Sequence, residues 1–468
     1  MNQLPDVTLT IEDGGLGLLP TASDQVVAIV GPALSGSVGA VISITSYDAL
    51  LTTFGGGALV DAAAVCISMG APQVLCVRSE GTLDGTTTVT GPGAGLVTIQ
   101  GQATRDADIA ITVTAGRVSI SREGRPAVAA GNVGTVIALA DLGVTLIVAF
   151  QGQVDYDTTI SFRLPKSHTG SIVNGIRSLL QDPREWGAVL VTGFDQPELY
   201  SQDPAVLAAA FDFAVVAGQL MDEASASHRY ASVILPAPVS QRGPDALAVA
   251  TQAFAHPRVM VAHGTAVIVH PINLQPATIP LAVVVAAKFV AAPISHDFGR
   301  VASGSLPGVL SISHDERQEP GLDAARFSTA RTFIGLPGFY LTAGRMFAAS
   351  GSDYEFVQHR RVMDRACKLS RAALLPYLND SVRVDTKTGG IDEGDARDVE
   401  TSLEASLDAD LVGAGHATRA KGRVIRTDAI IQTKTMRVSL NIIPKGYLRA
   451  IGITLSFINP ALATATSD

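Results

Sequence analysis

The chain opens with an α/β pattern that stops and later resumes, and this interruption limits the folds open to it. Gln25–Gly31 is a continuous apolar run that ends in glycine, and Gln73–Arg78 is a second such run. Continuous apolar runs of this length are typical of buried parallel strands. The alanine-rich stretch Leu59–Met69, which Gly70 ends, is the predicted helix between them. The first 80 residues therefore predict a small strand–helix–strand unit.

Residues 81–162 have a different composition. They are rich in Thr, Gly and Val, with short alternating runs such as Thr86–Thr90 and Ile109–Thr114. Alternation bounded by glycine and proline turns is typical of antiparallel strands. Buried-strand patterns return after Lys166, at Ala188–Thr192 and Ala231–Leu235. We therefore predict an antiparallel β domain inserted into an α/β core.

A third region begins near Gly299. Two long helices of opposite charge are predicted there, a basic one at Tyr354–Leu375 and an acidic one at Asp395–Ala409. Three strand-like runs follow, and they are Arg423–Ile431, Thr435–Ile443 and Leu448–Phe457. This order predicts a C-terminal α+β domain.

The N-terminus carries one short strand pattern. Val7-Thr8-Leu9-Thr10-Ile11 alternates and is followed by Asp13-Gly14-Gly15, which breaks a strand. A strand this close to a terminus has no local hairpin partner. It must pair with a distant strand or with another chain.

The predicted fold class is therefore multidomain, α/β and α+β, with extended arms at both ends. The predicted limits are an N-terminal arm at 1–22, an α/β core at 23–80 and 163–298, an inserted protruding β domain at 81–162, a C-terminal α+β domain at 299–455 and a C-terminal arm at 456–468.

The composition fits a protein that is covered by other subunits. Charged residues make up 16% of the chain, whereas about 25% is usual. Such a deficit is expected when much of the surface is buried against neighbours, and the 47% hydrophobic content excludes disorder as a main theme. The net charge of −9 argues against a nucleic-acid coat or a binder of anionic membranes.

The cysteines and termini indicate a reducing compartment. Cys66, Cys76 and Cys367 give neither a disulfide framework nor a zinc pattern. The first 13 residues contain acids and no basic segment, so they do not predict a signal peptide. The longest uncharged stretch, 259–287, contains three prolines, which predicts against a transmembrane helix. We expect a soluble protein of the cytoplasm.

Two motifs point to catalysis only weakly. Gly31-Pro-Ala-Leu-Ser-Gly36-Ser37 resembles a phosphate loop, but Ser37 replaces the lysine that grips the phosphates. Ser295-His296-Asp297 and Ser313-His314-Asp315 could carry out acid–base chemistry, and they define an alternative in which the chain is an α/β hydrolase. We expect no cofactor, no metal and no catalytic residue, with the histidines in structural roles.

The basic helix is a candidate for a charged contact. Arg361, Arg365 and Lys368 recur at helical spacing, which places them on one face. That face is either solvated or bound to an acidic partner. The acidic helix that follows could complement it, within one subunit or between two.

Taken in order, these segments resemble the contractile tail sheath proteins of phages and of contractile injection systems. The resemblance rests on three stretches. The first runs from Val27-Ala-Ile-Val-Gly-Pro32 through Ile44-Thr-Ser-Tyr-Asp48 and Phe54-Gly-Gly-Gly57 to the strand that ends in Val77-Arg78. The second is Tyr354-Glu-Phe-Val-Gln-His-Arg-Arg361, and the third is the C-terminal set of strands.

The resemblance implies a structural role. Sheath subunits form rings of six that stack around an inner tail tube, and arms at the termini add strands to the C-terminal sheets of neighbouring subunits. Contraction is then a switch of the assembly from a metastable extended state. The implied partners are further copies of the chain, the inner tube protein, and baseplate and tail terminator proteins, with no nucleic acid and no membrane insertion. The implied location is a virion tail or an injection particle that is assembled in the bacterial cytoplasm.

The resemblance also implies roles for particular residues. The arm candidates are Val7, Thr8, Leu9, Thr10, Ile11, Ile451, Ile453, Leu455 and Phe457. The candidates in strands that accept arms are Ile425, Ile430, Val438, Leu440 and Ile442. The candidates for tube-facing charges are Arg360, Arg361, Arg365, Lys368, Glu400 and Glu404. Another tail or baseplate assembly protein is the remaining alternative.

Overall fold

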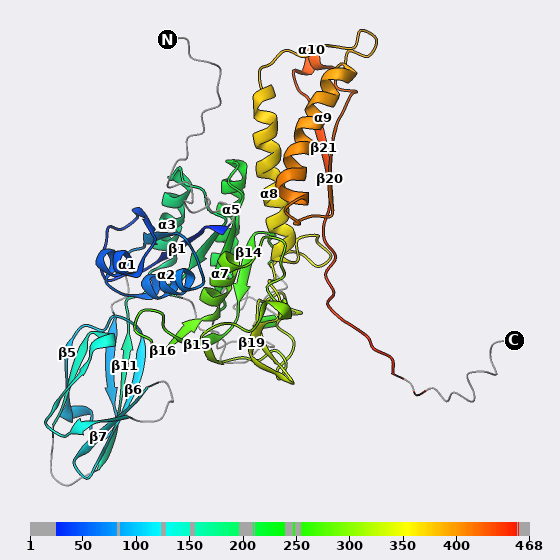
Figure 1. Cartoon of the computed structure of the whole chain (residues 1–468). Coiled ribbons are helices and arrows are strands. Elements are labelled where there is room, and N and C mark those ends of the chain that lie inside the picture. Colours follow the sequence, from blue (N-terminus) through cyan, green and yellow to red (C-terminus); the bar gives the residue numbers. More distant parts are fainter. Residues whose placement is uncertain are drawn as a thin grey trace, which may run out of the picture.

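A parallel sheet with helices on both faces forms the centre of the molecule (Figure 1). The computed structural model describes residues 25–81, 85–122, 128–149, 155–195, 209, 211–238, 247–248, 254–455 and 457. The strands of the central sheet are β1 (Val27–Gly31), β2 (Val41–Ile44), β3 (Val74–Arg78), β12 (Ala188–Val191), β13 (Ser232–Pro236) and β14 (Val259–Ala262). They lie in the order β14-β13-β12-β1-β3-β2, and all pairs are parallel except β2 with β3.

The helices of this unit are α1 (Tyr47–Phe54), α2 (Ala58–Ser68), α3 (Thr169–Gln181), α5 (Asp212–Ala226) and α7 (Leu281–Ala291). Helices α2 and α7 pack on one face of the sheet, and α3 and α5 on the other. Strand β1 is buried at every position, because it contributes side chains to both of these cores. The apolar runs that predicted buried strands therefore do form the central sheet.

The chain between β3 and α3 forms two antiparallel sheets, at one end of the molecule in Figure 1. Their strands are β4 (Thr86–Thr90), β5 (Val97–Gly101), β6 (Ala107–Thr114), β7 (Arg117–Arg122), β8 (Val128–Asn132), β9 (Val136–Leu139), β10 (Val144–Val148) and β11 (Tyr156–Arg163), with short helices η2 (Ala94–Leu96) and η3 (Ala140–Leu142). Strand β6 alternates strictly between buried and exposed positions, and its inward side chains contribute to a core between the two sheets.

A set of short strands follows α5 and the central sheet. These are β15 (Thr265–Val269), β16 (Pro276–Pro280) and β17 (Val309–Ile312) in one antiparallel sheet, and the hairpin of β18 (Ala330–Phe333) and β19 (Leu336–Leu341), with η5 (Val301–Ser303) nearby. The two strands of this hairpin are joined by the turn at Ile334-Gly335.

The C-terminal unit stands at the other end of the molecule (Figure 1). It contains α8 (Val357–Leu374), η6 (Leu375–Tyr377), α9 (Glu393–Leu407), the π-helical turn η7 (Asp408–Val412), β20 (Arg419–Val424), α10 (Ile430–Thr433) and β21 (Val438–Ile443). Helix α8 packs on α9, and α9 packs on the two-stranded sheet of β20 and β21. The mixed α/β multidomain class that we predicted is confirmed.

Two of the strands predicted in this unit are wrong. The run 423–431 contains the end of β20 and the start of α10, and between them Asp428 turns the chain by accepting the backbone N–H of Arg437 at 3.1 Å. The described part of the run 448–457 contains no strand. The N-terminal strand predicted at Val7–Ile11 lies outside the described residues.

Candidate functional site

The two-stranded sheet of β20 and β21 lies directly on helix α9. Alternate residues of β20, which are Ala420, Gly422 and Val424, face the helix and are buried. A Cβ atom at Gly422 would come within 2.5 Å of the Leu403 side chain, so glycine is what permits this close approach. No further strand pairs with either outer edge of this sheet in the described part of the chain. The sheet therefore leaves open edges, which are natural positions for an added strand.

An ion-pair network fixes α9 to the end of β20. The Arg426 guanidinium binds two carboxylates of α9. It lies 2.5 Å from Glu400 and 2.8 Å from Glu393, the first residue of the helix. The Glu400 carboxylate also accepts the backbone N–H of Val424 at 2.7 Å. Hydrogen bonds from Arg426 hold the pKa of Glu400 below its usual value. Glu400, a predicted tube-facing charge, is thus occupied inside the subunit.

After β21 the chain runs back toward the base of α8, where two side chains hold it. The Tyr447 hydroxyl donates to the Ser295 carbonyl at 2.7 Å, and Arg449 binds Asp297 at 2.5 Å. The Arg449 guanidinium also lies 3.5 Å from the ring centre of Phe356. Burial, with the nearby Asp297 charge, raises the pKa of Tyr447 to about 12. We call this set of contacts the arm anchor.

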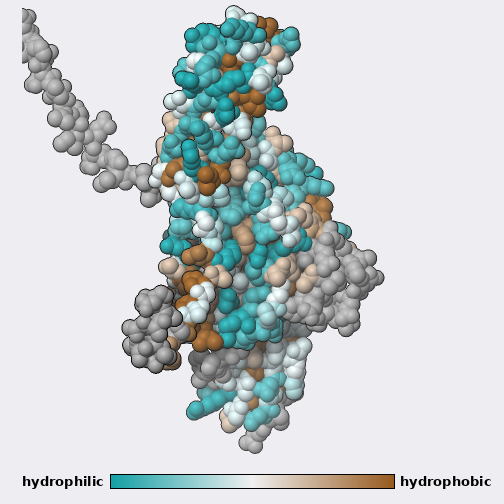
Figure 2. All heavy atoms as spheres, turned by 90° about the vertical axis from the view of Figure 1, so that its right-hand side faces the viewer, coloured by the Kyte–Doolittle hydropathy of each residue, from teal (hydrophilic) through white to brown (hydrophobic). Residues whose placement is uncertain are grey.

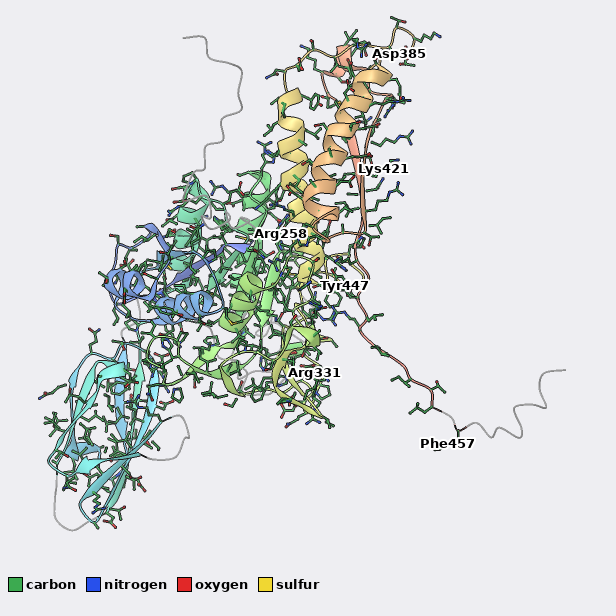
Figure 3. The ribbon with its side chains drawn as sticks, in the orientation of Figure 1. Arg258, Arg331, Asp385, Lys421, Tyr447 and Phe457 are labelled. Atoms are coloured by element: carbon green, nitrogen blue, oxygen red, sulfur yellow. The ribbon has the colours of Figure 1, made fainter. Side chains whose placement is uncertain are left out.

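Beyond the arm anchor the chain leaves the body of the molecule (Figure 1), and its apolar side chains are exposed to solvent. The exposed fractions of Ile451 and Ile453 are 77%, that of Leu455 is 89% and that of Phe457 is 107%. Figure 3 shows Phe457 at the far end of this segment, well away from the folded units. Figure 2, which views the molecule from this side, shows apolar atoms exposed at several places. Alternating apolar residues with no partner are expected of a strand that is completed by another molecule.

The predicted arm-accepting residues are divided between strand and helix. Val438, Leu440 and Ile442 lie in β21 with their side chains half-buried toward α9. Ile425 follows β20, and its N–H still donates to Arg437 at 2.9 Å. Ile430 lies in α10, so its assignment to a strand is wrong.

Two of the predicted tube-facing charges point inward. Arg360 and Arg361 have exposed fractions of only 7% and 3%. Arg360 binds Asp364 at 2.6 Å, and Arg361 donates to the carbonyls of Phe289 and Ala292 at the C-terminal end of α7. A guanidinium at a helix C-terminus satisfies carbonyls that have no partner within the helix. These two arginines therefore join α8 to the α/β core and do not lie on a surface.

The remaining charged candidates are partly exposed. Arg365 lies 3.8 Å from Asp410 and Lys368 lies 3.5 Å from Glu185, so the basic stripe contacts acids of the same subunit. Glu404 is half-buried on α9. The helical spacing correctly placed Arg361, Arg365 and Lys368 on one side of α8, but that side packs against the protein.

The two Ser-His-Asp segments serve structural contacts. Asp297 accepts from Gln358 and Arg449, and Ser295 contacts His416 at 3.2 Å. His314 instead binds the buried Glu316 at 3.2 Å. Neither segment forms a serine–histidine–aspartate chain of hydrogen bonds among the described residues. The loop after β1 is likewise structural, since Arg78 donates to the Gly36 carbonyl at 2.5 Å.

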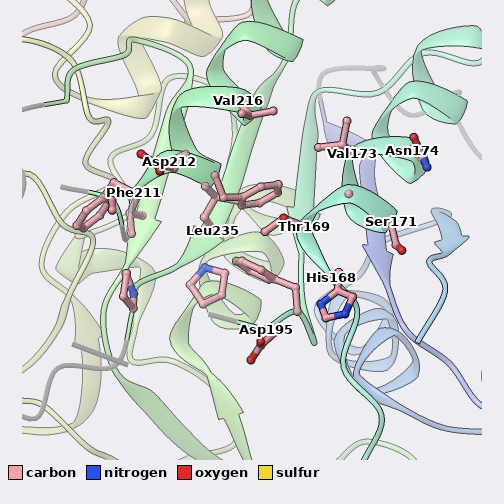
Figure 4. Close-up of a pocket in the computed structure, with 18 of the residues that line it drawn as sticks. His168, Thr169, Ser171, Val173, Asn174, Asp195, Phe211, Asp212, Val216 and Leu235 are labelled. Carbon is pink, nitrogen blue, oxygen red and sulfur yellow. The ribbon is translucent and has the colours of Figure 1, made fainter. Parts of the chain in front are cut away.

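A hollow of about 610 Å³ lies at the carboxyl ends of β12 and β13 (Figure 4). Its walls come from the first turns of α3, the start of α5 and the strand ends, and its ionisable side chains are His168, Arg177, Asp195 and Asp212. Crevices of this kind often bind ligands in α/β folds. Here His168, Asp195 and Asp212 are exposed.

The residues that the structure describes contain neither a cluster of metal ligands nor a helix suited to cross a membrane. No three His, Cys, Asp or Glu side chains are grouped in a way that could hold a metal ion. None of the helices described has both the length and the apolarity that a membrane span requires.

Several residues of this site were not predicted from the sequence. These are Tyr447 and Arg449 of the arm anchor, and Arg258 and Asp364, which form the buried pair beside Arg360. Asp297, which binds Arg449, was singled out only for the hydrolase alternative. Each pair is separated by more than 100 positions, so no local pattern connects its members. Only the position of Asp364 between two basic residues on a predicted helix hinted at an ion pair.

The comparisons with known proteins place the chain in a family. The family model described as DUF2586, N-terminal domain, matches residues 4–345, and that described as DUF2586, C-terminal domain, matches residues 353–462. A search of curated proteins found no match.

Solved structures show the same fold over the whole chain. The helical sheath of the anti-feeding prophage in its contracted state is 13% identical, with a TM-score of 0.53, and the match covers 98% of this chain and 99% of that one. The contracted sheath complex of PVC, an extracellular contractile injection system, is 12% identical with a TM-score of 0.53, over 97% and 98%. A chain of the anti-feeding prophage baseplate is 12% identical with a TM-score of 0.52, over 98% and 100%. This chain therefore belongs to the DUF2586 family and has the fold of contractile tail sheath proteins.

Proposed function

We propose that this chain is a structural subunit of a contractile tail sheath. One observation carries the proposal. The same subunit has a two-stranded sheet with open edges and an exposed, alternating apolar segment that pairs with no strand among the described residues. A strand donor and a strand acceptor in one chain make a subunit that links to further copies of itself. The full-length likeness to two contracted sheaths supports this reading.

The proposed assembly consists of rings of six subunits stacked around an inner tail tube. Residues 1–22 and 456–468 act as arms, together with Ile451, Ile453 and Leu455, and they complete the sheets of neighbouring subunits. The core at 23–80 and 163–298 carries the protruding domain at 81–162, and the C-terminal domain at 299–455 faces the tube. Contraction moves the subunits between two packings while the strand connections persist.

The proposed partners are the tube protein, a baseplate and a tail terminator, in a phage tail or an injection particle assembled in the cytoplasm. Arg365, Lys368 and Glu404 remain the proposed tube contacts, because they are partly exposed, whereas Arg360 and Arg361 are buried and Glu400 is held by Arg426. The role is mechanical and not catalytic. The hydrolase alternative has no observation in its favour, since both Ser-His-Asp segments make structural contacts.

Electron microscopy of the purified protein tests this proposal. We expect hollow, striated tubes in negative stain, and we expect a variant lacking residues 1–12 to form none. A matched deletion within the solvated turn 387–389 should leave the tubes intact, because that turn contributes no strand. A uniform field of small particles at every concentration would contradict a sheath subunit.

A further inference from the structure

The sheet of β20 and β21 has one face against α9 and one face exposed. Arg419, Lys421 and Arg423 alternate with the buried residues of β20 and lie on the exposed face. Figure 3 shows Lys421 pointing away from the helices. The three residues opposite them on β21 are uncharged, and they are Ser439, Asn441 and Ile443. We call Arg419, Lys421 and Arg423 the cation row.

The charges of the cation row are not compensated within the subunit. None of its side chains forms an ion pair with the described part of the chain. Neighbouring members lie about 7 Å apart along the strand, so their charges repel one another. Carboxylates on the neighbouring strand would relieve this repulsion, but β21 supplies none. The row therefore fits a partner that presents carboxylates along a line of about 13 Å.

Such a line of carboxylates lies on α9. The exposed side of this helix carries Asp398 and, at its C-terminal end, Asp408, with Thr401 and Ala405 exposed between them. A rise of about 1.5 Å per residue puts the two carboxylates about 15 Å apart. The intervening side chains are small, so another surface can approach the helix closely. We call Asp398 and Asp408 the α9 acids.

The α9 acids also lack a cation. Neither forms an ion pair within the described residues, whereas the neighbouring Asp410 lies 3.8 Å from Arg365. Asp408 lies at the C-terminal end of α9, whose last turn contains no basic residue. The carbonyl groups at this end of a helix carry a partial negative charge, so a carboxylate there is unfavourable and a cation is favourable. The end of α9 therefore favours a cation that its own chain does not supply in the described residues.

The two surfaces lie on different sides of the C-terminal unit. The buried residues of β20 face α9, so the cation row is on the far side of the sheet from that helix. The α9 acids are on the side of the helix that packing against α8 and the sheet leaves exposed. Figure 1 shows α8, α9 and the sheet following one another across this unit. Complementary surfaces on different sides of one subunit join copies head to tail, in rings or in open helical arrays.

We propose that the cation row of one subunit docks on the α9 acids of a second copy, with Lys421 over Ala405. The spans of about 13 Å and about 15 Å let Arg419 and Arg423 each reach one acid in either direction of the strand. The contact joins the face of a sheet to the side of a helix, so it involves neither a terminal arm nor a strand edge. This inference rests on the proposed function, because it adds a separate contact between the copies of the sheath.

Charge exchange tests the contact in the full-length protein. R419E combined with R423E should lower the yield of tubes about tenfold at low salt, because two attractions become two repulsions. D398K combined with D408K should lower it similarly, and a chain that carries all four changes should recover it. R117E combined with K387E is the matched control for the first variant. Arg117 and Lys387 are exposed elsewhere and the net charge changes equally, so the yield should stay the same.

The outcomes separate this contact from other roles of the same residues. Normal tubes from R419E/R423E would overturn the proposal, and so would a four-fold variant that keeps the wild-type Tm but forms no tubes. A loss confined to the capture of a tail tube would show that the cation row binds that protein instead.

Cross-linking tests which surfaces meet, whether or not tubes form. In a Cys367→Ser background, one chain carries Lys421→Cys and a differently tagged chain carries Ala405→Cys, and a short bis-maleimide joins cysteines that lie close together. The native Cys66 and Cys76 are buried. We expect at least about tenfold more mixed dimer than with Arg117→Cys in place of Lys421→Cys, because docking raises the local concentration of the two thiols.

Equal yields from the two cysteine pairs would overturn the proposed contact. If the wild-type chain still forms tubes in that case, the proposed function stands without it. A chain that forms neither tubes nor mixed dimers contradicts both.

Discussion

Asp364 lies between two buried guanidinium groups, and this arrangement fixes the base of α8. Its two carboxylate oxygens bind Arg360 at 2.6 Å and Arg258 at 3.1 Å, and Arg258 also donates to the Ala231 carbonyl beside β13. Figure 3 shows Arg258 at the junction between the central sheet and the C-terminal unit. One carboxylate thus connects two units that are distant in the sequence.

Removing the Asp364 carboxylate should strongly destabilise the folded protein. Asp364→Ala leaves two positive charges buried without their partner, and we expect the free energy of unfolding to fall by about 3–5 kcal/mol. Urea denaturation followed by circular dichroism measures this. Asp398→Ala, on the exposed side of α9, is the control and should change stability by less than about 0.5 kcal/mol. Equal losses for the two variants would show that the pair contributes nothing.

A second residue-scale prediction concerns His263. Burial lowers its pKa to about 4, and the neighbouring His314, 5.1 Å away between ring centres, adds to the effect. The folded state therefore resists protonation of His263, so this contribution to stability is complete above pH 6.5 and is lost as the pH falls toward 4. His314 acts in the opposite sense, since its bond to Glu316 raises its pKa and its contribution is lost as the pH rises above that raised value.

We expect His263→Asn to remove up to about 3 kcal/mol of the fall in unfolding free energy between pH 6.5 and pH 4. Urea titrations at several pH values measure it. His228→Asn, at an exposed position, should leave the pH dependence unchanged. A His263→Asn protein with the wild-type pH profile would contradict the assignment.

At the scale of elements, the arm anchor determines where the C-terminal segment leaves the body. Asp297 receives Arg449 on one side and is held by Gln358 of α8 and by the N–H of Gly299. Asp297→Asn weakens the ionic bond, so Lys445 and Arg449 become easier to reach. We expect trypsin to cleave after these residues several-fold faster, as judged by mass spectrometry. Asp398→Asn is the matched control, and unchanged cleavage in Asp297→Asn would show that the anchor is not what protects the chain.

Sequence patterns predicted an element well where its formation depends on neighbouring residues in the chain. The helix expected at Leu59–Met69 is α2 (Ala58–Ser68), within one residue at either end. Arg419-Ala-Lys-Gly-Arg-Val424 was not predicted as a strand, because glycine and cations are poor strand formers and pairing with β21 supplies the stability. Helical spacing grouped Arg361 with Arg365, but the carbonyls of α7 that receive Arg361 come from a distant segment. Which face of α8 is buried could not be read from spacing alone.

At the scale of the whole molecule, the described part of the C-terminal arm contributes little to the subunit and much to the proposed assembly. Ile451, Ile453 and Leu455 are exposed and lie outside every core cluster. We expect deletion of residues 451–468 to shift the Tm by less than about 2 °C, since the described apolar residues of this segment are exposed, yet to abolish tubes. Calorimetry and negative-stain microscopy measure the two effects. Thr454→Ser is the control, and tubes that persist after the deletion would contradict strand donation by this arm.

The buried contacts at the base of α8 attach that helix to the core at one end only. Its 18 residues span about 27 Å, and Asp364, Arg360 and Arg361 hold its first turns to the core. If the core tilts by about 10° with α8 rigidly attached, the far end of the helix sweeps about 5 Å, which is close to the spacing between neighbouring strands. With α8 attached in this way, a small rotation of the core would be amplified into a displacement of one strand width at the tip of the C-terminal unit.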